Sequence, residues 1–161
     1  MQRITPNLWF DKQAEEAAKF YVSVFKNSKI TSIARYSEAG AKASGVPKGT
    51  VMTVAFQMDG QDFVGLNGGP IFKFTEAISF IVNCKNQEEV DWYWKKLSEG
   101  GEVGVCGWLK DKYGVSWQVV PTILVEMLMD KDPRKAERVM STMLQMKKIE
   151  IEPLKKTYAQ K

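Results

Sequence analysis

A pattern of apolar and polar residues occurs twice in this chain, and this repeat restricts its fold more than any other feature. Residues 15–21 read Glu-Glu-Ala-Ala-Lys-Phe-Tyr, and residues 88–94 read Glu-Glu-Val-Asp-Trp-Tyr-Trp, an offset of 73 residues. In each copy an apolar strand pattern precedes the helical segment, and further strand patterns follow it. Because solenoid repeats are only about 20–50 residues long, this distance indicates a duplicated module. The sequence therefore predicts an α+β fold with two copies of a βαβββ unit.

The first expected module occupies residues 1–75. Its elements in chain order are a strand at 4–10, a helix at 12–25, a strand at 28–36, a loop at 38–49, and strands at 50–58 and 61–67. The helix carries its apolar side chains at helical spacing, and Asp11 is its expected N-cap. The dipeptide Asp59-Gly60 between the last two strands predicts a tight hairpin.

The second expected module occupies residues 76–121. Its elements are a strand at 77–84, a helix at 87–99, and strands at 101–108 and 115–121, with a turn at 110–114. Asn86 is the expected N-cap of the helix. The strand pattern and the helix repeat the order of the first module, so we assign both to the same βαβββ topology.

Residues 122–161 differ from both modules and predict a C-terminal helical extension. We expect helices at 122–130 and 134–146 and a short strand at 148–152, with Asp132-Pro133 starting the second helix. Five of the eight methionines lie in this region, which indicates a Met-rich packing face. We expect this face to pack on the body of the chain or on a dimer partner.

The chain contains no histidine, and this restricts its chemistry. Ser–His and Cys–His nucleophile pairs and histidine metal sites are excluded. The two cysteines, Cys84 and Cys106, have no CxxC spacing, and we expect reduced thiols rather than a disulfide framework. No apolar run reaches the ~18 residues of a membrane span, and no signal-peptide core is recognisable, so we expect a cytoplasmic protein without a membrane partner.

The net charge of +4 does not predict a nucleic-acid partner. The lysines of the basic tail are interleaved with Glu150 and Glu152 and form no dense run. Such a pattern is typical of a solvated helix face, so we expect no nucleic acid to bind.

Three strings carry a resemblance to a known family. Residues 4–11 read Ile-Thr-Pro-Asn-Leu-Trp-Phe-Asp, residues 14–21 read Ala-Glu-Glu-Ala-Ala-Lys-Phe-Tyr, and residues 107–121 read Gly-Trp-Leu-Lys-Asp-Lys-Tyr-Gly-Val-Ser-Trp-Gln-Val-Val-Pro. They resemble the PhnB-like proteins, often labelled the 3-demethylubiquinone-9 3-methyltransferase family, of the vicinal-oxygen-chelate (glyoxalase/bleomycin-resistance/dioxygenase) superfamily. The resemblance runs from residue 1 to 152. It implies paired βαβββ modules, a small-molecule groove and a homodimer.

The resemblance also implies where a metal or a cofactor would bind. In the superfamily's metalloenzymes the ligands are His or Glu, and the matching positions here are Thr5, the segment 65–67, Ile78 or Ser79, and Gln118. These side chains are poor ligands for Zn, Ni or Mn, so we expect no metal. The glycines at 100, 101, 104 and 107 form no GxGxxG motif, so we expect no nucleotide-type cofactor and give the methyltransferase label no support.

Aromatic and amide side chains on the expected strands are the candidate ligand-binding residues. The set is Trp9, Asn67, Phe72, Cys106, Trp108, Trp117 and Gln118. The alternatives are aromatic rings that fill the core, amides with structural partners and an inert buried thiol. Because strand side chains alternate, Trp117 and Gln118 point to opposite faces, and we expect Gln118 in the groove and Trp117 in the core.

These observations predict a metal-free protein that binds a small molecule in an aromatic-lined cleft. The alternative is an enzyme of the same superfamily that acts through a non-histidine site, with Asp, Tyr or Cys as its reactive group.

Overall fold

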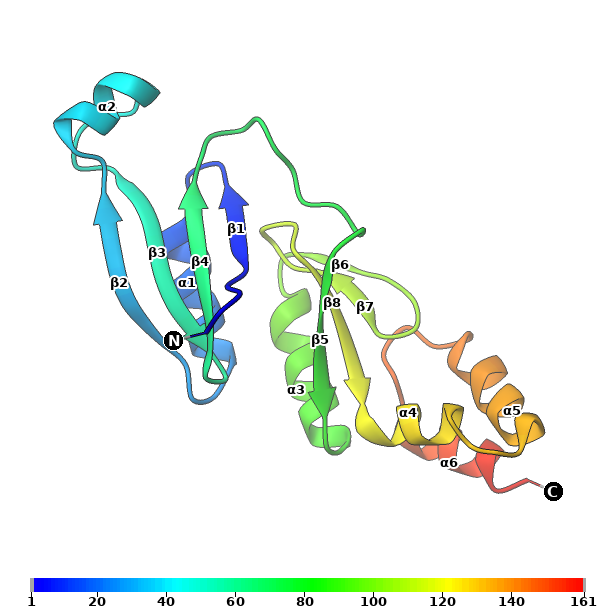
Figure 1. Cartoon of the computed structure of the whole chain (residues 1–161). Coiled ribbons are helices and arrows are strands. Elements are labelled where there is room, and N and C mark those ends of the chain that lie inside the picture. Colours follow the sequence, from blue (N-terminus) through cyan, green and yellow to red (C-terminus); the bar gives the residue numbers. More distant parts are fainter. Residues whose placement is uncertain (1, 161) are drawn as a thin grey trace. The chain divides into compact units, whose positions relative to one another are not determined.

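The computed structural model describes residues 2–160 and divides into two compact units, one that ends at Lys73 and one that begins at Phe74. Figure 1 shows the first unit in blue to green and the second in green to red. Each unit contains one four-stranded sheet with a helix on one face. The predicted α+β fold with two βαβββ modules and a C-terminal helical extension is confirmed.

The first unit forms a sheet of strand order β1-β4-β3-β2. Its elements are β1 (Asn7–Phe10), α1 (Ala14–Val24), β2 (Lys29–Arg35), α2 (Glu38–Ser44), β3 (Val51–Met58) and β4 (Gln61–Asn67). Strand β1 runs parallel to β4, and the other neighbours are antiparallel. Asp59 and Gly60 both have positive φ, which confirms the predicted hairpin turn.

Helix α1 buries its apolar stripe against this sheet. Tyr21 is fully buried and stacks on Phe56 of β3, with ring centroids 6.1 Å apart, and Phe56 in turn stacks on Phe63 of β4. The helix begins at Ala14, and its N-cap is Gln13, not the predicted Asp11. The predicted loop at 38–49 contains the short helix α2, because Ser37 caps it and Gly45 ends it in the left-handed conformation.

The second unit repeats the topology with strand order β5-β8-β7-β6. Its elements are β5 (Ser79–Cys84), α3 (Gln87–Ser98), β6 (Glu102–Val103), β7 (Trp108–Lys110), β8 (Ser116–Pro121), α4 (Thr122–Leu128), α5 (Pro133–Met143) and α6 (Ile151–Tyr158). Strand β5 runs parallel to β8. The Asn86 side chain accepts a hydrogen bond from the backbone N–H of Glu89, which confirms the predicted cap of α3.

The predicted single strand at 101–108 is wrong, because the chain turns within it. Cys106 and Gly107 both have positive φ, and the N–H of Trp108 donates to the carbonyl of Val105. This tight turn divides the segment into two strands, β6 and β7. With β5 and β8 the module therefore has four strands. A non-glycine residue such as Cys106 seldom adopts positive φ, so its conformation could not be expected from sequence.

The C-terminal helices form their own apolar cluster in the second unit. Its buried members are Leu124, Met127, Val139, Ile149 and Leu154. The backbone N–H groups of Cys106 and Gly107 donate to the carbonyls of Met146 and Lys147 and tie the cluster to the β6–β7 turn. The predicted strand at 148–152 is wrong, because α6 begins at Ile151 and packs on α5.

Candidate functional site

The second sheet has one face covered by α3 and an opposite face that carries polar and half-exposed side chains. Trp117 and Val119 of β8 are buried, whereas Gln118 between them is half-exposed. In the strand register Trp108 lies opposite Gln118, and Lys110 lies opposite Ser116. Because cross-strand partners share a face, these four side chains lie together on the face away from α3, which we call the open face.

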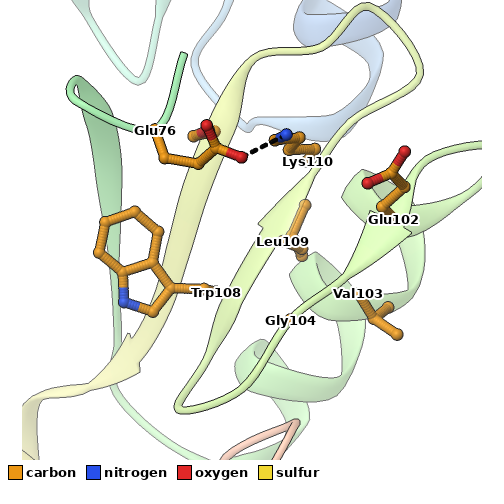
Figure 2. A pocket seen from close by; sticks show the side chains of 8 residues that line it. Glu76, Glu102, Val103, Gly104, Trp108, Leu109 and Lys110 are labelled. Atoms are coloured by element: carbon orange, nitrogen blue, oxygen red, sulfur yellow. Dashed lines mark ion pairs between the residues drawn. The ribbon is translucent and has the colours of Figure 1, made fainter.

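A cavity of about 160 Å³ lies against this sheet (Figure 2). Its lining includes Glu76, Glu102, Val103, Trp108, Lys110 and Ser116. Strands β6, β7 and β8 supply all of these except Glu76, which comes from the segment that leads into β5. The lining therefore combines one indole, one hydroxyl and three charged groups in a small space.

Ser116 is the most unusual member of the lining. It is 1% exposed, and within the described residues 2–160 its Oγ has no hydrogen-bond partner. A buried hydroxyl without a partner loses its hydrogen bonds with water and gains none, and native proteins contain few such groups. A ligand in the cavity could therefore supply the hydrogen bond that the Ser116 hydroxyl lacks.

Glu76 and Lys110 form an ion pair beside the cavity, drawn as a dashed line in Figure 2. Their mutual hydrogen bond lowers the pKa of Glu76 and raises the pKa of Lys110. The carboxylate of Glu102 also raises the pKa of Lys110 through its charge. Since both members of the pair contact water, the pair positions the Lys110 ammonium more than it stabilises the fold.

Asp111 holds the hairpin that places Lys110 and Ser116. Its carboxylate is 3% exposed and accepts backbone hydrogen bonds from Tyr113 (2.9 Å) and Val115 (3.1 Å). These bonds close the turn between β7 and β8. The string of residues 107–121 that carries the family resemblance therefore contains both this scaffold and the cavity side chains of Trp108, Lys110 and Ser116.

The structure separates the predicted site residues of this unit. Trp108 lines the cavity, and Gln118 lies on the same open face, where its Nε2 donates to Ser79 Oγ (2.9 Å). Trp117 is 2% exposed and packs on Phe80 with ring centroids 5.4 Å apart. It is therefore a core residue and not a ligand-binding residue as the predicted set had it. The predicted opposite orientation of Trp117 and Gln118 is confirmed.

Cys106 lies in the β6–β7 turn, and its thiol contacts the carbonyl of Met143 at the end of α5 (3.7 Å). It does not belong to the lining of the cavity. The other thiol, Cys84, is fully buried, and this burial raises its pKa to about 12. Cys84 is thus protonated and inert at physiological pH.

The first unit contains the remaining predicted residues. Trp9 donates from Nε1 to the carbonyl of Gly69 (2.9 Å), and its ring meets Phe72 edge to face, with centroids 4.9 Å apart. Phe72 is 61% exposed.

Asn67 is buried, and both ends of its amide have structural partners: Oδ1 accepts from the N–H of Ala14, and Nδ2 donates to the carbonyl of Val51. Asn67 is therefore a structural amide that caps α1, and not the ligand-binding residue that the sequence predicted.

Among the lining residues the sequence predicted only Trp108, and it missed all four polar ones: Glu76, Glu102, Lys110 and Ser116. Ser116 and Gln118 lie two residues apart on the predicted strand 115–121, so strand alternation could have placed Ser116 on the face of Gln118. Lys110 lay in the predicted turn at 110–114, where alternation does not apply. Glu76 and Glu102 gave no comparable signal, because a loop residue and a two-residue strand have no periodicity.

The donor set of the described chain does not fit a metal site. Within residues 2–160, no three side chains of His, Cys, Asp or Glu come together as metal ligands would. Within the same residues, every helix is too short or too polar to span a lipid bilayer.

Comparison with known proteins confirms the resemblance. The sequence profile of the 3-demethylubiquinone-9 3-methyltransferase family matches residues 2–120. The solved structure of a PhnB protein from Bacillus cereus is 39% identical, and the alignment covers 75% of this chain and all of that chain, with a TM-score of 0.67. No curated protein matches the sequence.

Two further structures share the fold at low identity. Protein PA1353 from Pseudomonas aeruginosa is 17% identical over 75% of this chain and 98% of its own, with a TM-score of 0.59. The fosfomycin resistance protein FosX from Listeria monocytogenes is 16% identical over 80% of this chain and 98% of its own, with a TM-score of 0.55. At these identities the similarity concerns the fold alone.

Proposed function

The chain belongs to the 3-demethylubiquinone-9 3-methyltransferase family, and we propose that it binds a small organic molecule in the cavity on the second sheet, without a metal. In this proposal Trp108 provides the apolar contact surface and Ser116 the central hydrogen bond. Gln118 lies on the same open face and contacts the part of the ligand that extends beyond the cavity.

The unpartnered hydroxyl of Ser116 carries this proposal. A side chain that is 1% exposed and lacks a partner destabilises the empty protein, and a ligand that pairs with it removes this penalty. Concave sites with apolar walls and few polar groups are the usual form of small-molecule sites, and the combination of Trp108 and Ser116 has this form.

The family description suggests a methyl-transfer reaction, but the cavity does not fit a nucleotide-type cofactor. A volume of about 160 Å³ has room for about one six-membered ring, whereas small-molecule sites for larger ligands have about 300–1,000 Å³. The donor set likewise does not fit a metal. The proposal therefore concerns binding and includes no reaction step.

The test is a titration of the ¹⁵N-labelled protein with benzyl alcohol, a neutral single-ring probe. We expect the indole N–H resonance of Trp108 to shift in a saturable way, and a Trp108→Phe variant identifies that resonance among the five tryptophans. The resonance of Trp92, which is exposed on α3, is the internal control and should not move. If neither benzyl alcohol nor a charged single-ring analogue shifts Trp108, the proposal is wrong.

We also propose that the chain forms a homodimer. The proposal is supported by apolar side chains that remain exposed on α4 and α5 and at their C-caps, namely Val125, Met129, Met140 and Leu144. Exposed apolar side chains become buried when they form part of a protein interface. Light scattering at micromolar concentration should give twice the mass of one chain, and a monomer would contradict the proposal.

A further inference from the structure

We infer that the occupant of the cavity is a single-ring organic cation, that is, an aromatic ring with a protonated amine attached through a short link. This inference rests on the proposed function, since it names the chemical class of ligand for the same cavity. Three observations lead to it: the volume of the cavity, the charge of its lining and the buried Ser116 oxygen, which has no hydrogen-bond partner within residues 2–160.

The volume of the cavity matches one ring. An engineered apolar cavity of about 150 Å³ in another protein is large enough to bind benzene. The cavity described here has about 160 Å³, with Val103 and Trp108 among its lining residues. A six-membered ring can lie on the Trp108 indole, whereas a fused ring system would extend beyond the cavity.

The charge of the lining favours a cation. Lys110 is paired with Glu76, so these two charges offset each other. Glu102 lies opposite Lys110 in the β6–β7 register and adds a second carboxylate, which leaves one net negative charge. An anionic ligand would meet this net negative charge, and the Coulomb energy of that encounter is unfavourable.

Two further groups recognise an ammonium specifically. The ring face of Trp108 attracts a cation through its quadrupole. The oxygen of Ser116, which has no partner within residues 2–160, has lone pairs that can accept an N–H from the ligand. Figure 2 shows the Trp108 indole near the Glu76–Lys110 pair, with Glu102 across the β7 strand.

The experiment compares three probes of equal ring size: benzylamine, which is protonated at pH 7, benzyl alcohol and benzoate. The dissociation constant of each is measured from the indole resonance of Trp108 in the full chain. We expect benzylamine to bind roughly three- to tenfold more tightly than benzyl alcohol, and benzoate to bind more weakly than either. Added salt should weaken benzylamine binding and leave benzyl alcohol binding unchanged.

Two variants test the assigned groups. Glu102→Gln should abolish the preference for benzylamine over benzyl alcohol without weakening the alcohol. Ser116→Ala should weaken the binding of both probes by about tenfold, because both lose the same hydrogen bond. Glu126→Gln removes one negative charge from the exposed surface of α4 and is the matched control, which should behave as the wild type.

The outcomes separate the two claims. If no probe shifts Trp108, the proposed function itself is wrong. If benzyl alcohol or benzoate binds as tightly as benzylamine, or if Glu102→Gln keeps the preference, the cavity is a binding site but the assignment of a cation is overturned.

Discussion

Asp111 and Trp117 are joined by a hydrogen bond of 2.8 Å, from the indole Nε1–H to the carboxylate Oδ2. Both side chains are buried, and the other carboxylate oxygen closes the turn between β7 and β8. The bond therefore links the core under α3 to the hairpin that carries Lys110 and Ser116. Packing beneath the sheet and the position of the cavity residues above it depend on the same carboxylate.

Trp117→Ala should lower the free energy of unfolding by roughly 3–5 kcal/mol, because it removes a buried ring and leaves one oxygen of Asp111 without its donor. Urea denaturation followed by circular dichroism measures this change. Trp92→Ala, at an exposed position on α3, is the control and should change stability by less than about 1 kcal/mol. A benign Trp117→Ala would mean that the faces of β8 are assigned the wrong way round.

Asn67→Ala should destabilise the protein more than Asn86→Ala, although both asparagines cap a helix. Asn67 is buried and its loss leaves the N–H of Ala14 and the carbonyl of Val51 unpaired, which costs about 2–4 kcal/mol. Asn86 is exposed, and removal of an exposed cap costs about 1 kcal/mol. Thermal denaturation of the two variants compares them directly, and equal losses would contradict a structural role for Asn67.

Ser116→Ala should leave the ligand-free protein as stable as the wild type, or up to about 1 kcal/mol more stable. The substitution removes a buried hydroxyl that has no partner within residues 2–160, so no hydrogen bond is lost. Ser79→Ala is the contrast, because Ser79 accepts a hydrogen bond from Gln118, and its loss should lower the stability. Chemical denaturation measures both, and a clear destabilisation by Ser116→Ala would indicate an unrecognised partner.

The stabilising effect of Asp91 should depend on pH. Hydrogen bonds from Lys148 and then Gln87 lower the pKa of Asp91. A carboxyl group with a lowered pKa stabilises the folded state above its unfolded pKa of about 3.9, and the effect is lost as the pH falls through the folded-state pKa.

For this reason Asp91→Asn should reduce the free energy of unfolding by about 0.5 kcal/mol at pH 7, a small value because the ion pair is half-exposed. Urea denaturation at several pH values should show the difference between wild type and variant disappearing by about pH 2. A difference that persists below that pH would show that the variant acts through packing.

Cys84 should not react with a thiol reagent in the folded protein. Burial raises its pKa to about 12, so the reactive thiolate is scarce and the sulfur is inaccessible. Titration with a chromogenic disulfide at pH 8 should detect no thiol in a folded Cys106→Ser variant and one thiol after denaturation. Rapid modification of that folded variant would contradict the buried position of Cys84.

The sequence determined those features that depend on neighbouring residues. The hairpin at Asp59-Gly60, the caps at Asn86 and Asp132, and the opposite orientation of Trp117 and Gln118 follow from turn chemistry, side-chain hydrogen bonding and the period of a strand. All of these act over a few residues. Together with the repeat at an offset of 73 residues, they were sufficient to predict the two modules and therefore the fold.

Only the tertiary structure decided which polar groups meet across the chain. Asn67 caps a helix that begins 53 residues earlier, and Glu76, in the segment before β5, pairs with Lys110 of β7. Ser116 lacks a partner within residues 2–160 although its sequence neighbours are well bonded. Local pattern shows which face a side chain occupies, but the partner of a buried polar group is set by strand register and packing between distant segments, and these exist only in the folded chain.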